Sequence, residues 1–343
     1  MSNEPPDSVT LVVLHGADLP PGRERFEGVP GVGPVRYATA DVLADALPGA
    51  HALFVWDLFS EAVTAAWSKA DALRWVHAAT AGVDNLMFPA LVGSDVVVTN
   101  SRGVFDEPIA EYVLGAVLAF AKDLPTTLDL QRRRVWRHRE TERVGGRHAL
   151  VVGTGPIGRA IARRLAAVGM SVEGAGRTAR RADPDFGTVV AAERLPTGPA
   201  TAEPAADSFA AALGRADYVV LAAPLTDDTR GLADAALLAR MRPTARLVNV
   251  GRGQLVVERD LVAALRAGRL AGAALDVFET EPLAEDSPLW ELPGVLVSPH
   301  MSGDVVGWRD ELVELFADNL RRFADGRELR NVVDKRRGYV SGS

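Results

Sequence analysis

The sequence predicts an α/β fold with two lobes, each an open, mostly parallel sheet with flanking helices. Short apolar runs of strand length recur along the chain, and stretches with helical periodicity separate them. A long apolar helical stretch interrupts this alternation after about residue 105, and the alternation begins again near residue 147. The chain has 343 residues, more than one hydrophobic core usually covers, so two lobes are the natural expectation.

The first hundred residues contain four runs that we expect to form strands, at 9–14, 52–56, 73–77 and 96–99. A helical stretch near 60–68 separates the second run from the third. Strands joined through helices favour parallel pairing, because a parallel pair needs a long crossover connection.

Two segments of unusual composition follow. Residues 107–122 (EPIAEYVLGAVLAFAK) are apolar around most of a helical wheel, which is typical of a helix buried on several sides. We expect it to bridge the lobes, to face a second subunit, or both. Residues 131–140 (QRRRVWRHRE) form a basic run that we interpret as a solvated or interface segment. Nucleic-acid binding is the alternative, but the net charge of -7 and a lone Trp136 disfavour it.

The second alternating section contains six expected strands, at 149–152, 171–175, 218–222, 246–249, 273–277 and 295–298, and a helix at 157–168. Residues 196–204, rich in Pro, Ala and Thr, are expected to form a surface loop. A final helix at 308–325 should fold back on the first lobe, because the second sheet is complete before it.

Composition excludes several classes of protein. Cysteine is absent, so disulfides, thiolate nucleophiles and zinc–thiolate sites are excluded, and we expect no metal. No uninterrupted apolar stretch reaches membrane-spanning length, and residues 1–8 lack the charged start and apolar core of a signal peptide. We therefore expect a cytoplasmic protein whose partners are neither membranes nor nucleic acids.

One glycine pattern points to a dinucleotide. Gly153, Gly155 and Gly158 follow a predicted strand and open a predicted helix, which is the context that the G-x-G-x-x-G motif requires. Gly153 permits the tight turn, Gly155 lets the backbone approach a pyrophosphate, and Gly158 allows helix and strand to pack closely. The helix N-terminus then offers N–H groups and a positive dipole end to the phosphates.

The end of the next strand bears on which dinucleotide binds. A site that prefers NAD usually places Asp or Glu there to hold the ribose 2′-hydroxyl, but Gly176 occupies that place. Arg177, Thr178 and Arg180 follow, and an arginine can pair with a 2′-phosphate. We therefore favour NADP, with NAD as the alternative; Glu173 lies in mid-strand and is not expected to reach the ribose.

Three further patterns place chemistry at predicted strand ends. They are VNVGRG with Arg252, ALDVFETEPL with Glu281, and SPHMSG with His300. In open α/β sheets, ligands bind outside the carboxyl ends of the strands, so these side chains are expected to converge beside the cofactor. Such a set suits reversible carbonyl reduction. The guanidinium binds a carboxylate, the imidazole protonates the incipient alkoxide, and the glutamate orients the imidazole and favours its charged form.

These patterns resemble the D-isomer-specific 2-hydroxyacid dehydrogenase family, most closely its glyoxylate/hydroxypyruvate reductase branch. The matching segments are GTGPIG, VLAAPLTDDTRGL, VNVGRG, ALDVFETEPL and SPH, and the resemblance covers nearly the whole chain. The formate dehydrogenase branch carries a glutamine in place of the glutamate, so Glu281 argues against that branch. Gly176 in place of an acid is the main departure from the family pattern.

The resemblance implies roles for the matching residues. Arg252 would bind the substrate, Glu281 would pair with the histidine, and His300 would be the acid/base. The loop of Thr80, Ala81, Gly82 and Val83 would hold the substrate carboxylate through its backbone N–H groups. Asp276 would face the nicotinamide carboxamide. The implied cofactor-binding residues are Gly153, Gly155, Pro156, Ile157, Gly158, Arg177, Thr178, Ala223, Pro224, Thr229, Val250, Gly251, Asp276, Ser302 and Gly303.

The resemblance also implies a domain organisation. Residues 1–103 would form a flavodoxin-like substrate-binding (catalytic) domain that residues 304–335 complete, and residues 104–303 a Rossmann cofactor domain. The active site would lie in the cleft between them, and a homodimer would form through the helix near 107–122.

The sequence thus predicts an oxidoreductase that transfers a hydride between NAD(P)H and a small 2-keto or D-2-hydroxy acid. Oxidation of 3-phosphoglycerate or phosphite by the same fold is one alternative. A corepressor-type protein that senses a dinucleotide without turnover is another, because fold alone does not fix function.

Overall fold

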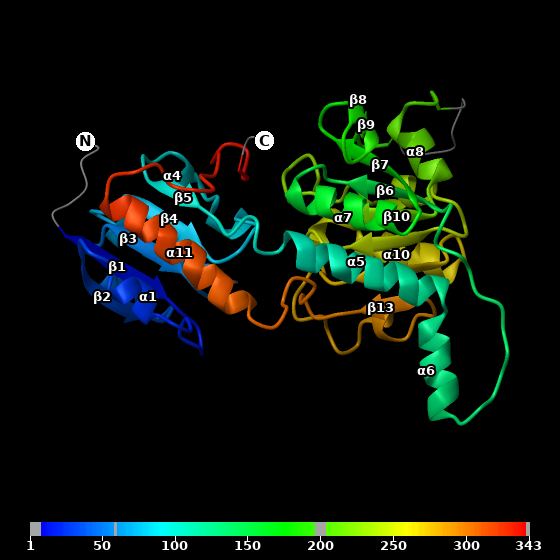
Figure 1. The fold of residues 1–343 in the computed structure, drawn as a ribbon, viewed down its shortest axis with the longest axis horizontal. Coiled ribbons are helices and arrows are strands. Elements are labelled where there is room, and N and C mark those ends of the chain that lie inside the picture. Colours follow the sequence, from blue (N-terminus) through cyan, green and yellow to red (C-terminus); the bar gives the residue numbers. More distant parts are fainter. Residues whose placement is uncertain (1–7, 58–59, 196–203, 341–343) are drawn as a thin grey trace. The chain divides into compact units, whose positions relative to one another are not determined.

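The computed structural model describes residues 8–57, 60–195 and 204–340 and confirms two α/β units (Figure 1). The first unit comprises Met1–Phe105 and Val305–Ser343, and the second comprises Asp106–Asp304. Of the loop expected at 196–204, only residue 204 lies among the described residues.

The first unit contains a parallel sheet of five strands in the order β2-β1-β3-β4-β5. The strands are β1 (Val9–Leu14), β2 (Val32–Ala38), β3 (Ala52–Val55), β4 (Trp75–Ala78) and β5 (Val97–Thr99). This is the flavodoxin-like order that the sequence analysis expected. The sequence analysis missed β2, an edge strand whose sequence VGPVRYA contains glycine and proline and is mostly not buried.

In the described part of this unit, four short helices and one long helix flank the sheet. They are α1 (Glu24–Glu27), α2 (Leu43–Ala46), α3 (Ala62–Ala66), α4 (Pro89–Val92) and α11 (Trp308–Ala324). The helix α11 lies against the face formed by β3 and β4 (Figure 1). There the ring of Phe316 stacks on Phe54, with 3.8 Å between ring centroids, and on Trp75 at 5.5 Å. All three side chains are fully buried, so α11 supplies the centre of this core layer.

The second unit contains an eight-stranded sheet in the order β13-β12-β11-β10-β6-β7-β9-β8. The strands are β6 (His148–Val152), β7 (Ser171–Gly176), β8 (Arg180–Asp183), β9 (Gly187–Ala191), β10 (Tyr218–Leu221), β11 (Arg246–Asn249), β12 (Gly272–Leu275) and β13 (Val295–Val297). Among these eight described strands, β8 alone is antiparallel to its neighbour. The strands β9, β7, β6, β10, β11 and β12 follow the 3-2-1-4-5-6 order of Rossmann folds, and β13 extends it.

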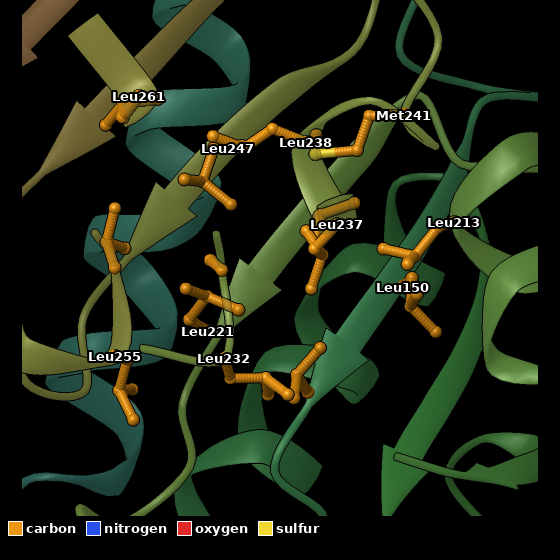
Figure 2. Close-up of a cluster of buried hydrophobic side chains, with 14 of the residues drawn as sticks. Leu150, Leu213, Leu221, Leu232, Leu237, Leu238, Met241, Leu247, Leu255 and Leu261 are labelled. Atoms are coloured by element: carbon orange, nitrogen blue, oxygen red, sulfur yellow. The ribbon is translucent and has the colours of Figure 1, made fainter. Parts of the chain in front are cut away.

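Helices cover both faces of the second sheet. They are α5 (Asp106–Ala121), α7 (Pro156–Ala167), α8 (Phe209–Arg215), α9 (Ala235–Leu238) and α10 (Glu258–Arg266), whereas α6 (Leu124–Arg132) follows α5 and projects away from the sheet (Figure 1). One face forms a leucine-rich core that Leu150, Leu221 and Leu247 enter from the sheet, and Leu213 and Leu261 from the helices (Figure 2). On the other face α5 packs along α7. The basic run at 131–140, whose first two residues are the last of α6, is almost entirely exposed, as expected of a solvated or interface segment.

The hairpin of β8 and β9, which the sequence analysis missed, is anchored to α7 by a buried carboxylate. Both oxygens of Asp183 accept hydrogen bonds at 3.0 Å from the guanidinium of Arg159, and Arg180 Nε donates to Oδ2 at 2.7 Å. The Asp183 side chain is only 2% exposed. Burial raises the pKa of Asp183, but the hydrogen bonds from Arg159 and Arg180 outweigh it and hold the pKa well below its usual range.

Replacing Phe316 with alanine should lower the free energy of unfolding by about 3–5 kcal/mol, because a buried aromatic ring leaves a cavity beside Phe54 and Trp75. Urea unfolding followed by tryptophan fluorescence measures the effect. The matched variant Val306→Ala removes a fully exposed side chain of the same unit and should change stability by less than about 0.5 kcal/mol. Equal stability of Phe316→Ala and wild type would contradict this packing.

Asp183→Asn should lower the free energy of unfolding at pH 7 by about 2 kcal/mol, less than for a fully buried pair because both arginines are partly exposed. A depressed carboxyl pKa stabilises the fold above the unfolded pKa of about 4, and this stabilisation is lost as the pH falls. The difference between variant and wild type should therefore shrink between pH 4 and pH 2 in urea unfolding. The control is Asp207→Asn, whose partner Arg181 is 84% exposed. A difference independent of pH would refute the charge argument.

Candidate active site

The register of three neighbouring strands brings the predicted triad to one edge of the second sheet. Asn249 at the end of β11 pairs with Leu275 at the end of β12, which pairs with Val297 at the end of β13. Arg252, Glu281 and His300 follow these three ends within a few residues. Because parallel strands point the same way, all three side chains start from the carboxyl edge, where ligands bind in open α/β sheets.

The imidazole of His300 is paired with Glu281. Its Nδ1 lies 2.7 Å from Glu281 Oε2, and both side chains are 30% exposed. Glu281 Oε1 accepts a hydrogen bond from the backbone N–H of Phe278 at 2.9 Å, so the carboxylate is fixed at both oxygens. Burial raises the pKa of Glu281, but the hydrogen bonds from His300 and from the Phe278 N–H outweigh it and lower the pKa. The carboxylate therefore stays ionised beside the imidazole at neutral pH.

Arg252 sits in a tight turn that its glycine neighbours make possible. A Cβ on Gly251 would lie 2.9 Å from the Ala223 carbonyl oxygen, and a Cβ on Gly253 only 1.8 Å from the backbone of Phe278. The buried Asn249 holds the turn from inside, because its Nδ2 donates to the Arg252 carbonyl at 2.9 Å and its Oδ1 accepts from Gly251 N–H. The positive charge of the Arg252 guanidinium also contributes to lowering the pKa of Glu281.

Asp276 anchors the loop that carries His300. Its carbonyl accepts the N–H of His300 at 2.8 Å, and its carboxylate accepts the N–H groups of Met301 and Ser302 at 2.9 Å each. The φ of His300 is +52°, a left-handed conformation that is uncommon for residues other than glycine. Three successive N–H groups directed at one residue hold the loop in this conformation. Asp276 itself is fully buried.

A chain of hydroxyl groups leads from α5 to Asp276. Ser298 Oγ donates to Asp276 Oδ1 at 2.6 Å, and Tyr112 lies 2.5 Å from Ser298 Oγ. The single proton of Ser298 is used on Asp276, so Tyr112 is the donor in the outer bond. The sequence analysis missed Tyr112. The one signal in the sequence for this pair was the position of Ser298, at a strand end two residues before His300. Three of the roughly four acceptor positions of the buried Asp276 carboxylate are therefore in use.

The glycine turn between β6 and α7 fits a dinucleotide phosphate. Gly153 has a φ of +111°, and a Cβ there would lie 2.5 Å from the backbone of Ala222. A Cβ on Gly158 would lie 1.9 Å from the Gly153 carbonyl oxygen. Beside Gly155, by contrast, a Cβ would meet nothing within 4 Å, so the backbone is open to a ligand where α7 begins at Pro156 and Ile157. The turn follows β6, and β6 lies beside β10 in the sheet at the point where the strand order reverses.

The other predicted cofactor residues lie on loops at this edge. Ala223 and Val250 are buried directly after β10 and β11. The hydroxyl of Thr229 donates to the Pro224 carbonyl at 2.7 Å, so it shapes the loop after β10. Ser302 and Gly303 are buried beyond His300.

The residues after β7 divide into two groups. Arg177 and Thr178 are exposed where the predicted ribose site would lie. Arg180 is held by Asp183, as described for the hairpin. Glu173 forms a two-oxygen ion pair with Arg215 at the end of α8, which agrees with the expectation that it does not reach the ribose.

The loop predicted to bind the substrate carboxylate lies in the first unit, directly after β4. Thr80, Ala81 and Gly82 are half-buried and Val83 is 3% exposed. Within residues 8–57, 60–195 and 204–340, no cluster of three potential metal-binding side chains occurs. No helix among these residues has the length and hydrophobicity to span a membrane.

Comparison with known proteins agrees with this geometry. Residues 114–302 match the family model described as "D-isomer specific 2-hydroxyacid dehydrogenase, NAD binding domain". An (S)-sulfolactate dehydrogenase of Chromohalobacter salexigens is 35% identical over 73% of this chain and 77% of its own length. A glyoxylate reductase of Thermococcus onnurineus is 33% identical over 81% of each chain.

A solved structure of similar fold holds a dinucleotide. It is the NADPH-dependent glyoxylate/hydroxypyruvate reductase of Sinorhizobium meliloti in complex with NADP and sulfate, 29% identical, with a TM-score of 0.76 over 97% of this chain and 100% of that one. The match to the family model and the similarity of these proteins confirm the resemblance that the motifs indicated. The chain belongs to the D-isomer specific 2-hydroxyacid dehydrogenase family and is an NAD(P)-dependent oxidoreductase.

Proposed function

We propose that this protein interconverts a small 2-keto acid and the corresponding D-2-hydroxy acid with NADP(H), and that glyoxylate and hydroxypyruvate are its best substrates. The observation that carries the proposal is the 2.7 Å pair of His300 and Glu281 at the carboxyl edge of a sheet whose glycine turn fits a dinucleotide. The Thermococcus and Sinorhizobium relatives support the choice of substrates.

In this mechanism the chain supplies charge and a proton. When bound, the reduced nicotinamide supplies a hydride to C2 of the keto acid. Glu281 occupies the Nδ1 side of His300, so we assign Nε2 as the atom that protonates the carbonyl oxygen. Arg252 and the N–H groups of residues 81–83 bind the substrate carboxylate. In the oxidative direction the same imidazole accepts the hydroxyl proton.

His300→Ala should lower kcat by a factor of about 10² to 10⁴, the usual contribution of a general acid, and leave the Kd of NADPH unchanged. Steady-state kinetics with glyoxylate, hydroxypyruvate, pyruvate, phenylpyruvate and 3-sulfopyruvate, each with NADPH and NADH, measures both activity and substrate class. His51→Ala is the matched control, because His51 precedes β3 at the amino edge of the first sheet.

Unchanged kcat in His300→Ala would remove the proton-donor assignment. Tight NADPH binding by the wild type without turnover of any acid would favour the corepressor-type alternative. A clear preference for 3-sulfopyruvate would move the substrate class toward that of the Chromohalobacter relative.

We propose that NADP is the preferred cofactor because Gly176 ends β7 where an acidic residue would select NAD, and Arg177 follows it. Arg177→Ala should raise the KM for NADPH about tenfold or more and leave the KM for NADH nearly unchanged, because only NADPH carries a 2′-phosphate. Arg259→Ala, a change at a side chain 87% exposed on α10, is the control. An equal change in both KM values would contradict the assignment. A homodimer through α5 and a cytoplasmic location stay predictions of the sequence.

A further inference from the structure

The loop after β4 directs its carbonyl groups into the protein. The Thr80 carbonyl accepts the N–H of Ser101 at 2.9 Å, and the Ala81 carbonyl accepts Nδ2 of Asn100 at 2.5 Å. The Gly82 carbonyl accepts the Thr80 hydroxyl at 2.5 Å. Three consecutive carbonyls are thus fixed by partners inside the first unit.

The N–H groups of the same peptides must point the other way. In a trans peptide the C=O and the N–H lie on opposite sides of the plane. Holding the carbonyls of residues 80, 81 and 82 therefore aims the N–H groups of Ala81, Gly82 and Val83 away from those partners. Among the described residues, none of these three N–H groups donates a hydrogen bond. Successive backbone N–H groups without an acceptor in a partly buried loop favour an anion.

Asn100 is the side chain that sets the middle peptide. It is 3% exposed, and its Oδ1 accepts the N–H of Arg102 at 3.3 Å. Because Oδ1 is bound there, the Nδ2 group is the one that faces the Ala81 carbonyl. The bond from Nδ2 to Ala81 orients the peptide whose other end is the N–H of Gly82. Gly82 has no side chain of its own that could hold this orientation, so Asn100 supplies it.

Asn331, in the segment after α11, holds Asn100 in turn. Its backbone carbonyl accepts the N–H of Asn100 at 3.3 Å. Its Nδ2 donates to the carbonyls of Asn100 at 3.2 Å and of Arg102 at 2.8 Å, which uses both amide protons. Asn331 has a φ of +58°, a conformation that asparagine tolerates better than most residues. Next to it, Val333 donates to the Val98 carbonyl of β5 at 2.8 Å.

From these contacts we propose that Asn100 and Asn331 are positioning residues that aim the N–H groups of Ala81, Gly82 and Val83 at the carboxylate of the substrate. The inference rests on the proposed function for the identity of the anion, a 2-keto or 2-hydroxy carboxylate. It assigns a role in substrate binding to the segment after α11, which the motifs of the sequence did not indicate.

Two substitutions test the proposal. Asn100→Asp keeps the acceptor for Arg102 but sets an oxygen against the Ala81 carbonyl, and Asn331→Gly keeps the left-handed backbone but removes both amide donors. The substrate carboxylate is bound equally in the ground state and the transition state. Weakening the contacts that bind it therefore raises KM and leaves kcat nearly unchanged. We expect Asn100→Asp to raise the KM for glyoxylate about tenfold, which corresponds to about 1.4 kcal/mol.

A binding measurement makes the test independent of turnover. Calorimetric titration of wild type and variants with oxamate, in the presence of NADP, should give a Kd that rises in parallel with KM, while the Kd of NADPH stays constant. Lys335→Met is the matched control. The Lys335 ammonium ties the same C-terminal segment to the carbonyls of Leu91, Ser94 and Val96 but does not contact residues 80–83. This variant should lower the Tm without changing the KM.

The outcomes separate the two hypotheses. If the wild type turns over keto acids but Asn100→Asp and Asn331→Gly retain its KM and oxamate Kd, the positioning role is overturned and the proposed function stands. If the wild type turns over no acid but binds oxamate, and the variants bind it more weakly, the proposed function fails and the positioning role stands. Absence of oxamate binding by the wild type, or an equal rise in KM in Lys335→Met, also overturns the inference.

Discussion

Parallel pairing of β11, β12 and β13 in register is the constraint on which the site depends. A parallel sheet places the ends of its strands at one edge, so three segments that are distant in sequence deliver Arg252, Glu281 and His300 to the same place. A slip of one residue in either ladder would turn the strand-end side chains to the other face of the sheet. Nearly all residues of β10, β11 and β12 are buried, so such a slip would exchange side chains of different size between two close-packed layers.

Hydrogen bonds to the backbone then fix the loops that follow the strands and carry the candidate site residues. Asp276 takes up three successive N–H groups around His300 and holds the histidine in a left-handed conformation. In the first unit the loop after β4 is held the opposite way: its carbonyl groups accept hydrogen bonds, and its N–H groups at 81–83 donate none among the described residues. Both loops use buried polar side chains, Asp276 in one and Asn100 in the other, to fix peptides that a sheet cannot hold.

Elements with strong apolar periodicity were predictable within one or two residues. Strands β1 and β11 have the predicted bounds, and α11 was predicted one residue too long. These elements were predictable because burial of one or both faces requires a regular pattern of apolar residues. The edge strands β2 and β8 were missed. The sequence RRAD of β8 has no apolar pattern, since its conformation comes from pairing with β9 and from the ion pairs of Asp183. Tyr112 was missed because nothing local marks a helix tyrosine as the partner of a serine 186 residues away.

Local periodicity and the spacing of a few residues were enough to predict the two-sheet α/β class, the glycine turn that opens α7, and the family to which the chain belongs. The 2.7 Å contact of His300 with Glu281, and the contact of Asn331 with Asn100 across 231 residues of chain, became visible in the folded structure alone. These are contacts between segments whose local patterns do not depend on each other, so they arise only when the strands have paired and the segment after α11 has joined the edge of the first sheet.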